Sequence, residues 1–270
     1  GAGIAELASR NGVSVRMRDL KPEALTRALQ IVRGLVDERG RKKKAPPRER
    51  EAQMALIYPT LELDGLARVD LAIEAVVEDL EIKRRVFAEL EVRMPADALL
   101  ATNTSSLSVD AIALGLQRPE RFCGFHFFNP VHRMPLVEVV RGSRTSDEAL
   151  SRAVAFARSL GKTPVVVRDA AGFVVNRLLM PYLREAMHLL EEGYALRDID
   201  SAMRRFGMPM GPFEVLDEVG LDVGQKVAGV LTAAFPDRMS PAPALDTLVA
   251  AGRLGRKSGN GFYRHQGSKR

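Results

Sequence analysis

Gly124-Phe-His-Phe-Phe-Asn-Pro130 and Leu136-Val-Glu-Val-Val140 are two apolar runs that predict strands, and they place His126 twelve residues before Glu138. A strand buries alternate side chains in hydrocarbon, where a charge is costly unless it is paired. Glu138 therefore needs a partner, and His126 is the obvious candidate. A carboxylate on one ring nitrogen makes the other a better base, which predicts a general base for neutral pH. The alternative is a satisfied core histidine beside a glutamate that faces solvent.

Around these runs, the first half of the chain alternates helical and strand patterns, as a parallel α/β sheet does. After Asp169 helical patterning dominates. We therefore expect an α/β domain over residues 1–168, an all-helical domain over 169–264 and a tail over 265–270. The strands are expected at 13–17, 70–77, 99–102 and 122–127, around Glu138 and at 164–167. The helices of the first half are expected at 1–10, at 22–40, through Met54 to Ile57, at 80–93 and at 146–160.

Composition excludes several classes of protein. The 270 residues are 46% apolar and 27% charged, ordinary values for one large or two smaller globular domains. No apolar run approaches the roughly 18 residues of a membrane span. The lone Cys123 fits a reducing compartment, so we expect a cytoplasmic protein. Four histidines and one cysteine without metal-ligand spacing predict that there is no metal site.

One segment holds the whole net charge of +6, since residues 39–50 contain seven basic residues and one acid. This segment has no aromatic residues, which disfavours nucleic-acid binding. A local anion, such as a phosphate-bearing small molecule, fits better. The alternative is a solvated basic loop. The basic residues are Arg39, Arg41, Lys42, Lys43, Lys44, Arg48 and Arg50, and the acid is Glu49.

Polar residues follow three expected strands, where open α/β sheets bind their ligands. They are Asp19, Glu78 and the segment 103–105. Asp19 lies eighteen residues after Gly1, at the end of the strand that follows a glycine-rich helix start. In a dinucleotide-binding fold such an acid binds ribose hydroxyls and disfavours a 2′-phosphate, which predicts NAD rather than NADP.

Several motifs, taken together, resemble the L-3-hydroxyacyl-CoA dehydrogenase family. They occur in the family's order from the first residue to about Tyr263. Two further stretches, 216–222 and 251–258, look more like the dehydrogenase part of the alpha subunit of the fused bacterial fatty-acid oxidation multienzyme. The motifs are Gly1-Ala-Gly-Ile-Ala5, Ile73-Glu-Ala-Val-Val-Glu78, Asn103-Thr-Ser-Ser106, Gly124-Phe-His-Phe-Phe-Asn-Pro130, Gly172-Phe-Val-Val-Asn-Arg177, Met210-Gly-Pro212 and Lys257-Ser-Gly-Asn-Gly-Phe-Tyr263.

The resemblance implies a Rossmann-type NAD-binding domain followed by an all-helical domain, and an enzyme of fatty-acid β-oxidation. His126 would be the catalytic base and Glu138 its partner, while Ser105 and Asn176 would bind the reacting oxygen of the substrate. Lys42 and Lys43 lie where the family covers the CoA moiety. Ser105 and Asn176 could instead cap helices, and Lys83 could be solvated. The residues expected at the NAD site are Gly1, Asp19, Val76, Val77, Glu78, Lys83, Asn103, Ser105 and Asn129.

The resemblance also implies partners: an acyl-CoA substrate, and either a homodimer formed through the helical domain or a fused or multi-subunit β-oxidation complex. No nucleic acid or membrane is expected. The sequence departs from the family at its start, because the first strand and two glycines of the dinucleotide motif are not present before Gly1. We expect that the natural chain begins upstream. Two alternatives remain: a non-catalytic scaffold within a multienzyme, and a dehydrogenase of a free 3-hydroxy acid.

Overall fold

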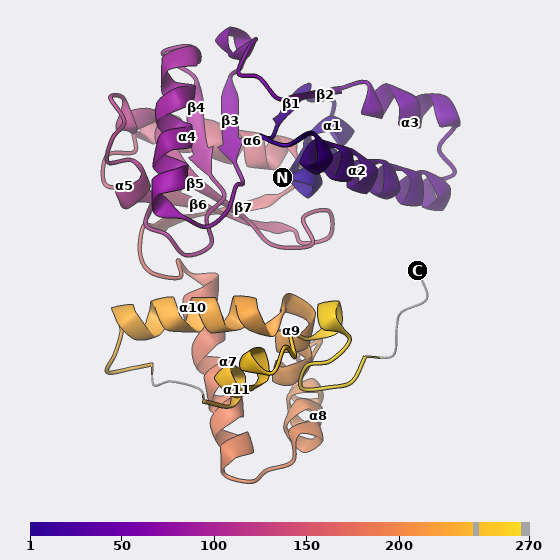
Figure 1. Ribbon diagram of the computed structural model, residues 1–270, viewed down its shortest axis with the longest axis vertical. Coiled ribbons are helices and arrows are strands. Elements are labelled where there is room, and N and C mark those ends of the chain that lie inside the picture. Colours follow the sequence, from indigo (N-terminus) through magenta and orange to yellow (C-terminus); the bar gives the residue numbers. More distant parts are fainter. Residues whose placement is uncertain (240–242, 266–270) are drawn as a thin grey trace. The chain divides into compact units, whose positions relative to one another are not determined.

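The computed structural model describes residues 1–239 and 243–265, which form two compact units (Figure 1). The first unit runs from Gly1 to Asp169 and contains both sheets, and the second begins at Ala170 and is built from helices. Of the tail expected over 265–270, only His265 lies within the described residues. In the described part of the chain, no helix combines the length and the apolar character needed to cross a bilayer.

The first unit holds a two-stranded and a five-stranded sheet. The small sheet pairs β1 (Val15–Arg18) with β2 (Ile57–Thr60) in parallel. In the larger sheet β5 and β6 are antiparallel, while the other neighbours are parallel. The connection over 128–135 explains this reversal, because a parallel crossover needs about a dozen residues or more. In spatial order the larger sheet contains β3 (Leu71–Glu74), β4 (Leu99–Thr102), β5 (Phe122–Phe127), β6 (Leu136–Arg141) and β7 (Thr163–Arg168).

Helices cover both faces of the larger sheet (Figure 1). On one face α1 (Ala2–Arg10) and α6 (Asp147–Ser159) share a core with alternate residues of the strands, among them Phe125 and Val139. On the other face lie α4 (Leu80–Arg93) and the short α5 (Val109–Ile112). Because side chains alternate along a strand, Phe125 faces the first core while Gly124 and His126 face the second side.

Gly124 allows α5 to approach this second face closely. A Cβ at Gly124 would lie 2.6 Å from Cβ of Val140 and 2.9 Å from Cγ2 of Val109. Next to it, the ring of Phe87 on α4 meets Phe122 edge to face, with 4.7 Å between the ring centroids. The glycine in the apolar run therefore makes room for α5, the helix that follows the expected substrate-binding segment.

The basic segment is mainly helical, which corrects the loop expected after Gly40. α2 (Pro22–Lys43) continues through three basic residues in its last turn, where cations interact favourably with the helix dipole. α3 (Pro47–Met54) then ends before Ile57, so the helix expected as far as Ile57 is also too long. Ile57 instead begins β2 and is buried against Ala5, Val32 and Val36.

Within the described residues of the second unit, five helices pack around one core, which includes Met187, Phe213, Leu216 and Leu231. A few short 3-10 turns complete the described elements of the chain, at Leu66–Arg68, Pro119–Arg121 and Arg256–Ser258. The helices are α7 (Val175–Glu191), α8 (Leu196–Phe206), α9 (Pro212–Val219), α10 (Leu221–Ala234) and α11 (Pro243–Ala250).

Two buried aspartates explain the glycine-rich motifs of this unit. Asp200 accepts hydrogen bonds from the Phe213 amide and the Tyr263 hydroxyl, at 3.0 and 2.7 Å. Asp217 accepts from the Tyr263 amide at 2.9 Å. A Cβ at Gly211 would lie 2.3 Å from Asp200, so that motif has no room for a side chain. Burial raises the pKa of Asp200, although the hydrogen bond from Tyr263 opposes this shift.

Candidate active site

His126 and Glu138 are directly opposite each other on β5 and β6. Nδ1 of His126 lies 2.8 Å from Oε2 of Glu138, and the two residues are 7% and 1% exposed. The predicted contact is confirmed, and the alternative of a glutamate facing solvent is wrong. A hydrogen bond from Nδ1 to the carboxylate selects the tautomer with its proton on Nδ1, which makes Nε2 the basic nitrogen.

The amino-acid order creates this pair through register alone. Val137 and Val139 flank Glu138 and belong to the core on the opposite face of the sheet. This core fixes which face Glu138 occupies, since a slip by one residue would turn it to the other side. The Phe128 ring packs against the imidazole, with 4.6 Å between the centroids. The side-chain oxygen of Asn103 also accepts a hydrogen bond from the Phe127 amide at 3.0 Å, which joins the end of β4 to β5 beside the histidine.

The segment after β4 wraps around the carboxylate of Glu78. Oε1 of Glu78 accepts from the Thr104 hydroxyl at 2.5 Å, from the Ser105 amide at 2.9 Å and from the Ser106 amide at 3.2 Å. The hydroxyl of Ser105 lies 3.4 Å from the same oxygen. Burial alone would raise the pKa of Glu78, but the Thr104 hydrogen bond and the charge of Lys83 outweigh it and hold that pKa below its usual range.

Ser105 is not a helix cap. α5 begins only at Val109, and its N-cap is Ser108, whose hydroxyl accepts from the Ala111 amide at 3.1 Å. Ser105 therefore lies in the turn between β4 and α5, half-buried and bonded to Glu78. This is the carboxyl edge of the sheet, where ligands of α/β folds bind.

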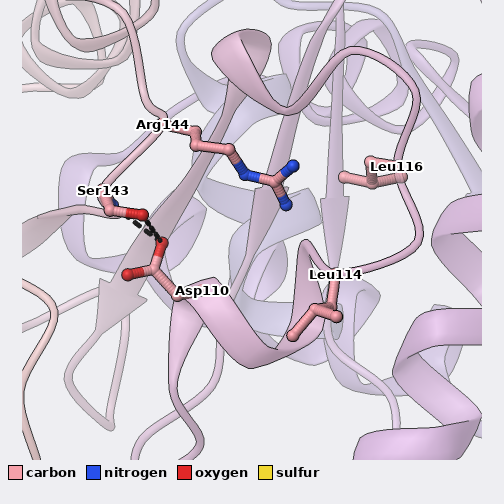
Figure 2. A pocket seen from close by; sticks show the side chains of 5 residues that line it. All are labelled: Asp110, Leu114, Leu116, Ser143 and Arg144. Carbon is pink, nitrogen blue, oxygen red and sulfur yellow. Dashed lines mark hydrogen bonds between the residues drawn. The ribbon is translucent and has the colours of Figure 1, made fainter.

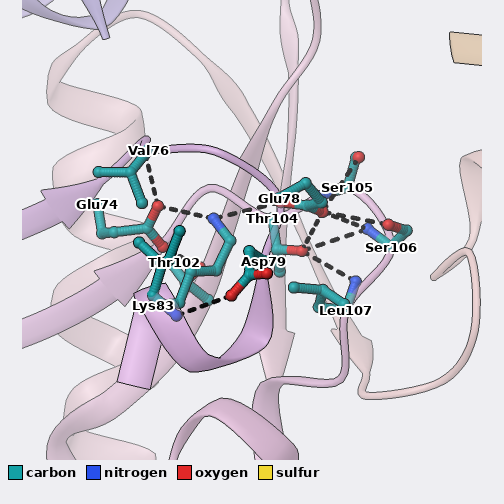
Figure 3. Close-up of polar contacts among 11 residues, drawn as sticks. Glu74, Val76, Glu78, Asp79, Lys83, Thr102, Thr104, Ser105, Ser106 and Leu107 are labelled. Atoms are coloured by element: carbon teal, nitrogen blue, oxygen red, sulfur yellow. Dashed lines mark hydrogen bonds and ion pairs between the residues drawn. The ribbon is translucent and has the colours of Figure 1, made fainter. Parts of the chain in front are cut away.

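Lys83 is a buried residue rather than a solvated one, because only 1% of it is exposed. Its ammonium lies 2.7 Å from Oε1 of Glu74 and 3.2 Å from Oε2 of Glu78 (Figure 3). Glu74 also accepts from the Thr102 hydroxyl at 2.8 Å. Neither Glu74 nor Thr102 was among the predicted site residues. The signal for Glu74 was present, since it is a glutamate within an apolar strand, as Glu138 is.

β3 ends at Glu74, which corrects the strand expected over 70–77. The reason is local: the Val76 amide donates to the Glu74 carboxylate at 2.7 Å, and the Asp79 amide bonds to the Val77 carbonyl. The chain therefore leaves the sheet, and Val76 and Val77 are 44% and 63% exposed. Two exposed valines at the carboxyl edge of a sheet form an apolar surface suited to a ligand.

The remaining residues expected around NAD lie just after a strand or at the start of a helix. Asp19 directly follows β1 and is exposed, and its carboxylate accepts from the Lys21 amide at 3.1 Å. Gly1 is the N-cap of α1, and a Cβ there would meet nothing within 4 Å. Asn129 is exposed in the connection between β5 and β6. An acid at the end of β1 and a helix N-terminus at Gly1 fit the ribose and phosphate groups of NAD.

Some basic residues of the segment 39–50 form ion pairs with acids, so the segment has fewer unpaired positive charges than its sequence implies. Lys42 lies 2.6 Å from Glu38, and Arg50 lies 3.0 Å from Asp37. Lys42 and Lys43 are both exposed in the last turn of α2. They remain at the surface, where a long anionic ligand can reach them.

Asn176 belongs to the second unit, in the first turn of α7. The N-cap of α7 is Val174, so Asn176 is not the capping residue. Gly172 has a φ of 72°, and a Cβ there would lie 2.8 Å from Leu231 and 3.3 Å from Cβ of Asn176. The Gly172-Phe-Val-Val-Asn motif thus sets a tight turn that leads into the helix carrying Asn176.

A separate pocket of about 380 Å³ lies at the surface of the first unit (Figure 2). It is lined by Asp110, Leu114, Leu116, Ser143 and Arg144. The amide and the hydroxyl of Ser143 donate hydrogen bonds to Oδ1 of Asp110, at 2.7 and 3.0 Å. None of the predicted site residues lines this pocket.

Comparison with known proteins identifies the family of this chain. Residues 1–170 match the model of the NAD-binding domain of 3-hydroxyacyl-CoA dehydrogenase, and residues 172–265 match the model of its C-terminal domain. The FadB2 structure from M. tuberculosis is 39% identical with a TM-score of 0.95, covering 98% of this chain and 95% of that one.

Two further structures are similar. A (S)-3-hydroxybutyryl-CoA dehydrogenase from Ralstonia eutropha is 36% identical with a TM-score of 0.94, covering 99% of this chain and 95% of that one. A 3-hydroxybutyryl-CoA dehydrogenase from Escherichia coli is 41% identical with a TM-score of 0.93, and the match covers all of this chain but 58% of that one. With its Rossmann-type unit, its helical unit and residues that fit NAD, this chain belongs to the 3-hydroxyacyl-CoA dehydrogenase family of NAD-dependent oxidoreductases.

Proposed function

We propose that this protein oxidises L-3-hydroxyacyl-CoA to 3-oxoacyl-CoA, a reaction of fatty-acid β-oxidation, with His126 as general base. The observation that carries the proposal is the buried His126–Glu138 pair, at 2.8 Å, within an NAD-binding unit. A base of this kind is what removal of a hydroxyl proton near neutral pH needs.

In this mechanism, Nε2 of His126 takes the proton of the substrate hydroxyl. Glu138 holds the ring by Nδ1 and stabilises the imidazolium that forms, as a buried carboxylate does for a catalytic histidine. Ser105 and Asn176 hydrogen-bond the reacting oxygen and hold it near the histidine. NAD, held by the residues named below, would supply the acceptor for the hydride that leaves C3 of the substrate. In the reverse direction, His126 returns its proton to the oxygen.

The cofactor is held, in this proposal, by residues at the carboxyl edges of the two sheets. Asp19 binds ribose hydroxyls, and Gly1 faces the phosphates at the start of α1. The remaining lining comes from Val76, Val77, Glu78, Asn103, Ser105 and Asn129, and Lys83 contributes through its ion pair with Glu78.

The acyl-CoA substrate is proposed to place its phosphates near Lys42 and Lys43. Both lysines are exposed at the end of α2, where the positive charges of the chain gather. The proposed setting is a cytoplasmic β-oxidation system. There the chain works as a homodimer through its helical unit or as part of a fused or multi-subunit complex.

Turnover of NADH with acetoacetyl-CoA, compared with acetoacetate, tests the proposal. We expect consumption of NADH with the CoA ester and little with the free acid, because only the ester carries phosphates for the basic segment. Activity confined to acetoacetate would favour a dehydrogenase of free 3-hydroxy acids. A folded protein that binds NADH and turns over neither would favour a non-catalytic scaffold.

A further inference from the structure

Glu74 joins three elements, β3, β4 and α4, at the carboxyl edge of the larger sheet. It is the last residue of β3 and is 4% exposed. Its Oε1 accepts from the Val76 amide and from Lys83 of α4, both at 2.7 Å, and its Oε2 accepts from Thr102 at the end of β4. Both carboxylate oxygens are thus tied to groups whose positions the sheet and α4 determine.

Lys83 links Glu74 to Glu78, so the fixed position of Glu74 limits where the carboxylate of Glu78 can lie. The lysine is 1% exposed and lies between two carboxylates, those of Glu74 and Glu78 (Figure 3). Oε2 of Glu78 contacts Lys83, while its Oε1 accepts from the Ser105 and Ser106 amides. A continuous set of contacts therefore runs from Glu74 through Lys83 and Glu78 to the turn that contains Ser105.

Stability alone does not account for such an arrangement. A buried ion pair adds little net stability compared with well-packed apolar side chains, because desolvation offsets the attraction. Its specific effect is orientation: one ammonium contacts both carboxylates, so each carboxylate is held in a narrow range of positions. A turn held by an oriented carboxylate presents its hydroxyl in one place, and a misplacement of about 1 Å can cost about 100-fold in rate.

We infer that Glu74 is a positioning residue that acts through Lys83 and Glu78 to place Ser105 for the reacting oxygen of the substrate. The inference rests on the proposed function, in which Ser105 binds that oxygen. Glu74 binds Val76, Lys83 and Thr102, and in this assignment it acts on Ser105 through Lys83 and Glu78 rather than on the substrate itself.

A kinetic cycle tests this assignment. Glu74→Gln should lower kcat with acetoacetyl-CoA by about 10- to 100-fold. In a Ser105→Ala background the same change should have little further effect, because the group to be positioned is gone. If Glu74→Gln lowers kcat by the same factor in both backgrounds, Glu74 does not act through Ser105 and the inference is overturned.

Glu91→Gln provides the matched control. Glu91 lies in the last turn of α4 and, like Glu74, is a buried glutamate, with 5% of it exposed. Its carboxylate accepts hydrogen bonds from the Gln117 and Arg118 amides at 2.8 and 2.9 Å. We expect this variant to lower the free energy of unfolding as Glu74→Gln does, but to keep kcat. Should Glu74→Gln fail to fold, the double variant Glu74→Gln/Lys83→Met replaces both charges of the pair and undergoes the same cycle.

Amide hydrogen exchange gives a result that does not need turnover. Glu74→Gln should speed exchange at Ser105 and Ser106 and leave Gln117 and Arg118 unchanged, whereas Glu91→Gln should do the reverse. If the wild type shows no turnover with acetoacetyl-CoA, the proposed function fails, yet exchange still decides whether Glu74 holds the turn. Unchanged exchange at Ser105 in Glu74→Gln overturns the inference even in an active enzyme.

Discussion

The five-stranded sheet contains two buried glutamates, Glu74 on β3 and Glu138 on β6, that solve the same problem differently. Both are nearly inaccessible, and both lie on the α4 side of the sheet, because Glu74 is in register with Thr102, and Thr102 with Gly124, two residues before His126. Glu138 meets a histidine on the adjacent strand. Glu74 meets a lysine from the helix that follows its own strand.

The difference shows what each partner contributes. An imidazole can hold the carboxylate with one nitrogen and exchange a proton with the other, so the Glu138 pair can accept and return a proton. The ammonium of Lys83 instead bridges two carboxylates, so the Glu74 pair holds geometry. One buried glutamate thus suits chemistry and the other suits positioning, although both follow from an acid in an apolar strand.

The largest expected effect is a loss of activity when the His126–Glu138 pair is broken. His126→Gln should lower kcat by about 10²- to 10⁴-fold, because it removes the general base, while NADH affinity should stay near that of the wild type. Turnover with acetoacetyl-CoA and titration of NADH fluorescence measure the two quantities. A variant with near-normal kcat would contradict the assignment of His126 as the base.

A somewhat smaller loss is expected for Glu138→Gln. The amide keeps the size of the side chain but removes the charge that stabilises the imidazolium and selects the tautomer. We expect kcat to fall by about 10²-fold or more. If this variant lost folding stability but kept its kcat, Glu138 would be a structural partner of His126 and no part of the general base.

Breaking the Glu74–Lys83 pair should, in addition, lower the free energy of unfolding. Lys83→Met leaves the carboxylates of Glu74 and Glu78 without their shared cation, and breaking a buried pair costs about 3–5 kcal/mol. Urea denaturation measures the loss. Arg33→Met is the control, because the Arg33–Glu51 pair, at 2.5 Å, is largely exposed, and exposed pairs contribute little. Equal losses in the two variants would contradict a special role for Lys83.

The smallest expected effect concerns pH. The pKa of Glu78 is lower in the folded protein than in the unfolded chain, so its ionised form stabilises the fold. This contribution is fully present above the unfolded pKa, about 4.3, and is lost as pH falls through the folded pKa. The difference in unfolding free energy between wild type and Glu78→Gln should therefore be constant near neutral pH and shrink in acid. A difference that persists into acid would contradict this expectation.

Much of the architecture was predictable from local pattern. The strands at 99–102 and 122–127 and the helix over 80–93 match the structure, because apolar periodicity and the Asp79 N-cap act locally. The strand β2 was missed, since Ile57 becomes a strand residue only through its burial against α1 and α2. The end of β3 was misplaced because the carboxylate of Glu74 draws the Val76 amide out of the sheet.

The site divides in the same way. An acid between two valines and a histidine in a neighbouring apolar run predicted the His126–Glu138 contact from sequence alone. Glu74 carried the same signal, but its partner Lys83 lies on a helix rather than in a neighbouring apolar run, so only the packing of α4 shows the contact.

The sequence by itself therefore determined the alternation of elements, the order of the family motifs and the need of each buried acid for a partner, because these depend on the chemistry of neighbouring residues. Only the tertiary structure decided which partner each acid received. Register places His126 opposite Glu138, and the packing of α4 on the sheet brings Lys83 between Glu74 and Glu78. Such contacts join separate elements, and only the packing of the core fixes the distances between them.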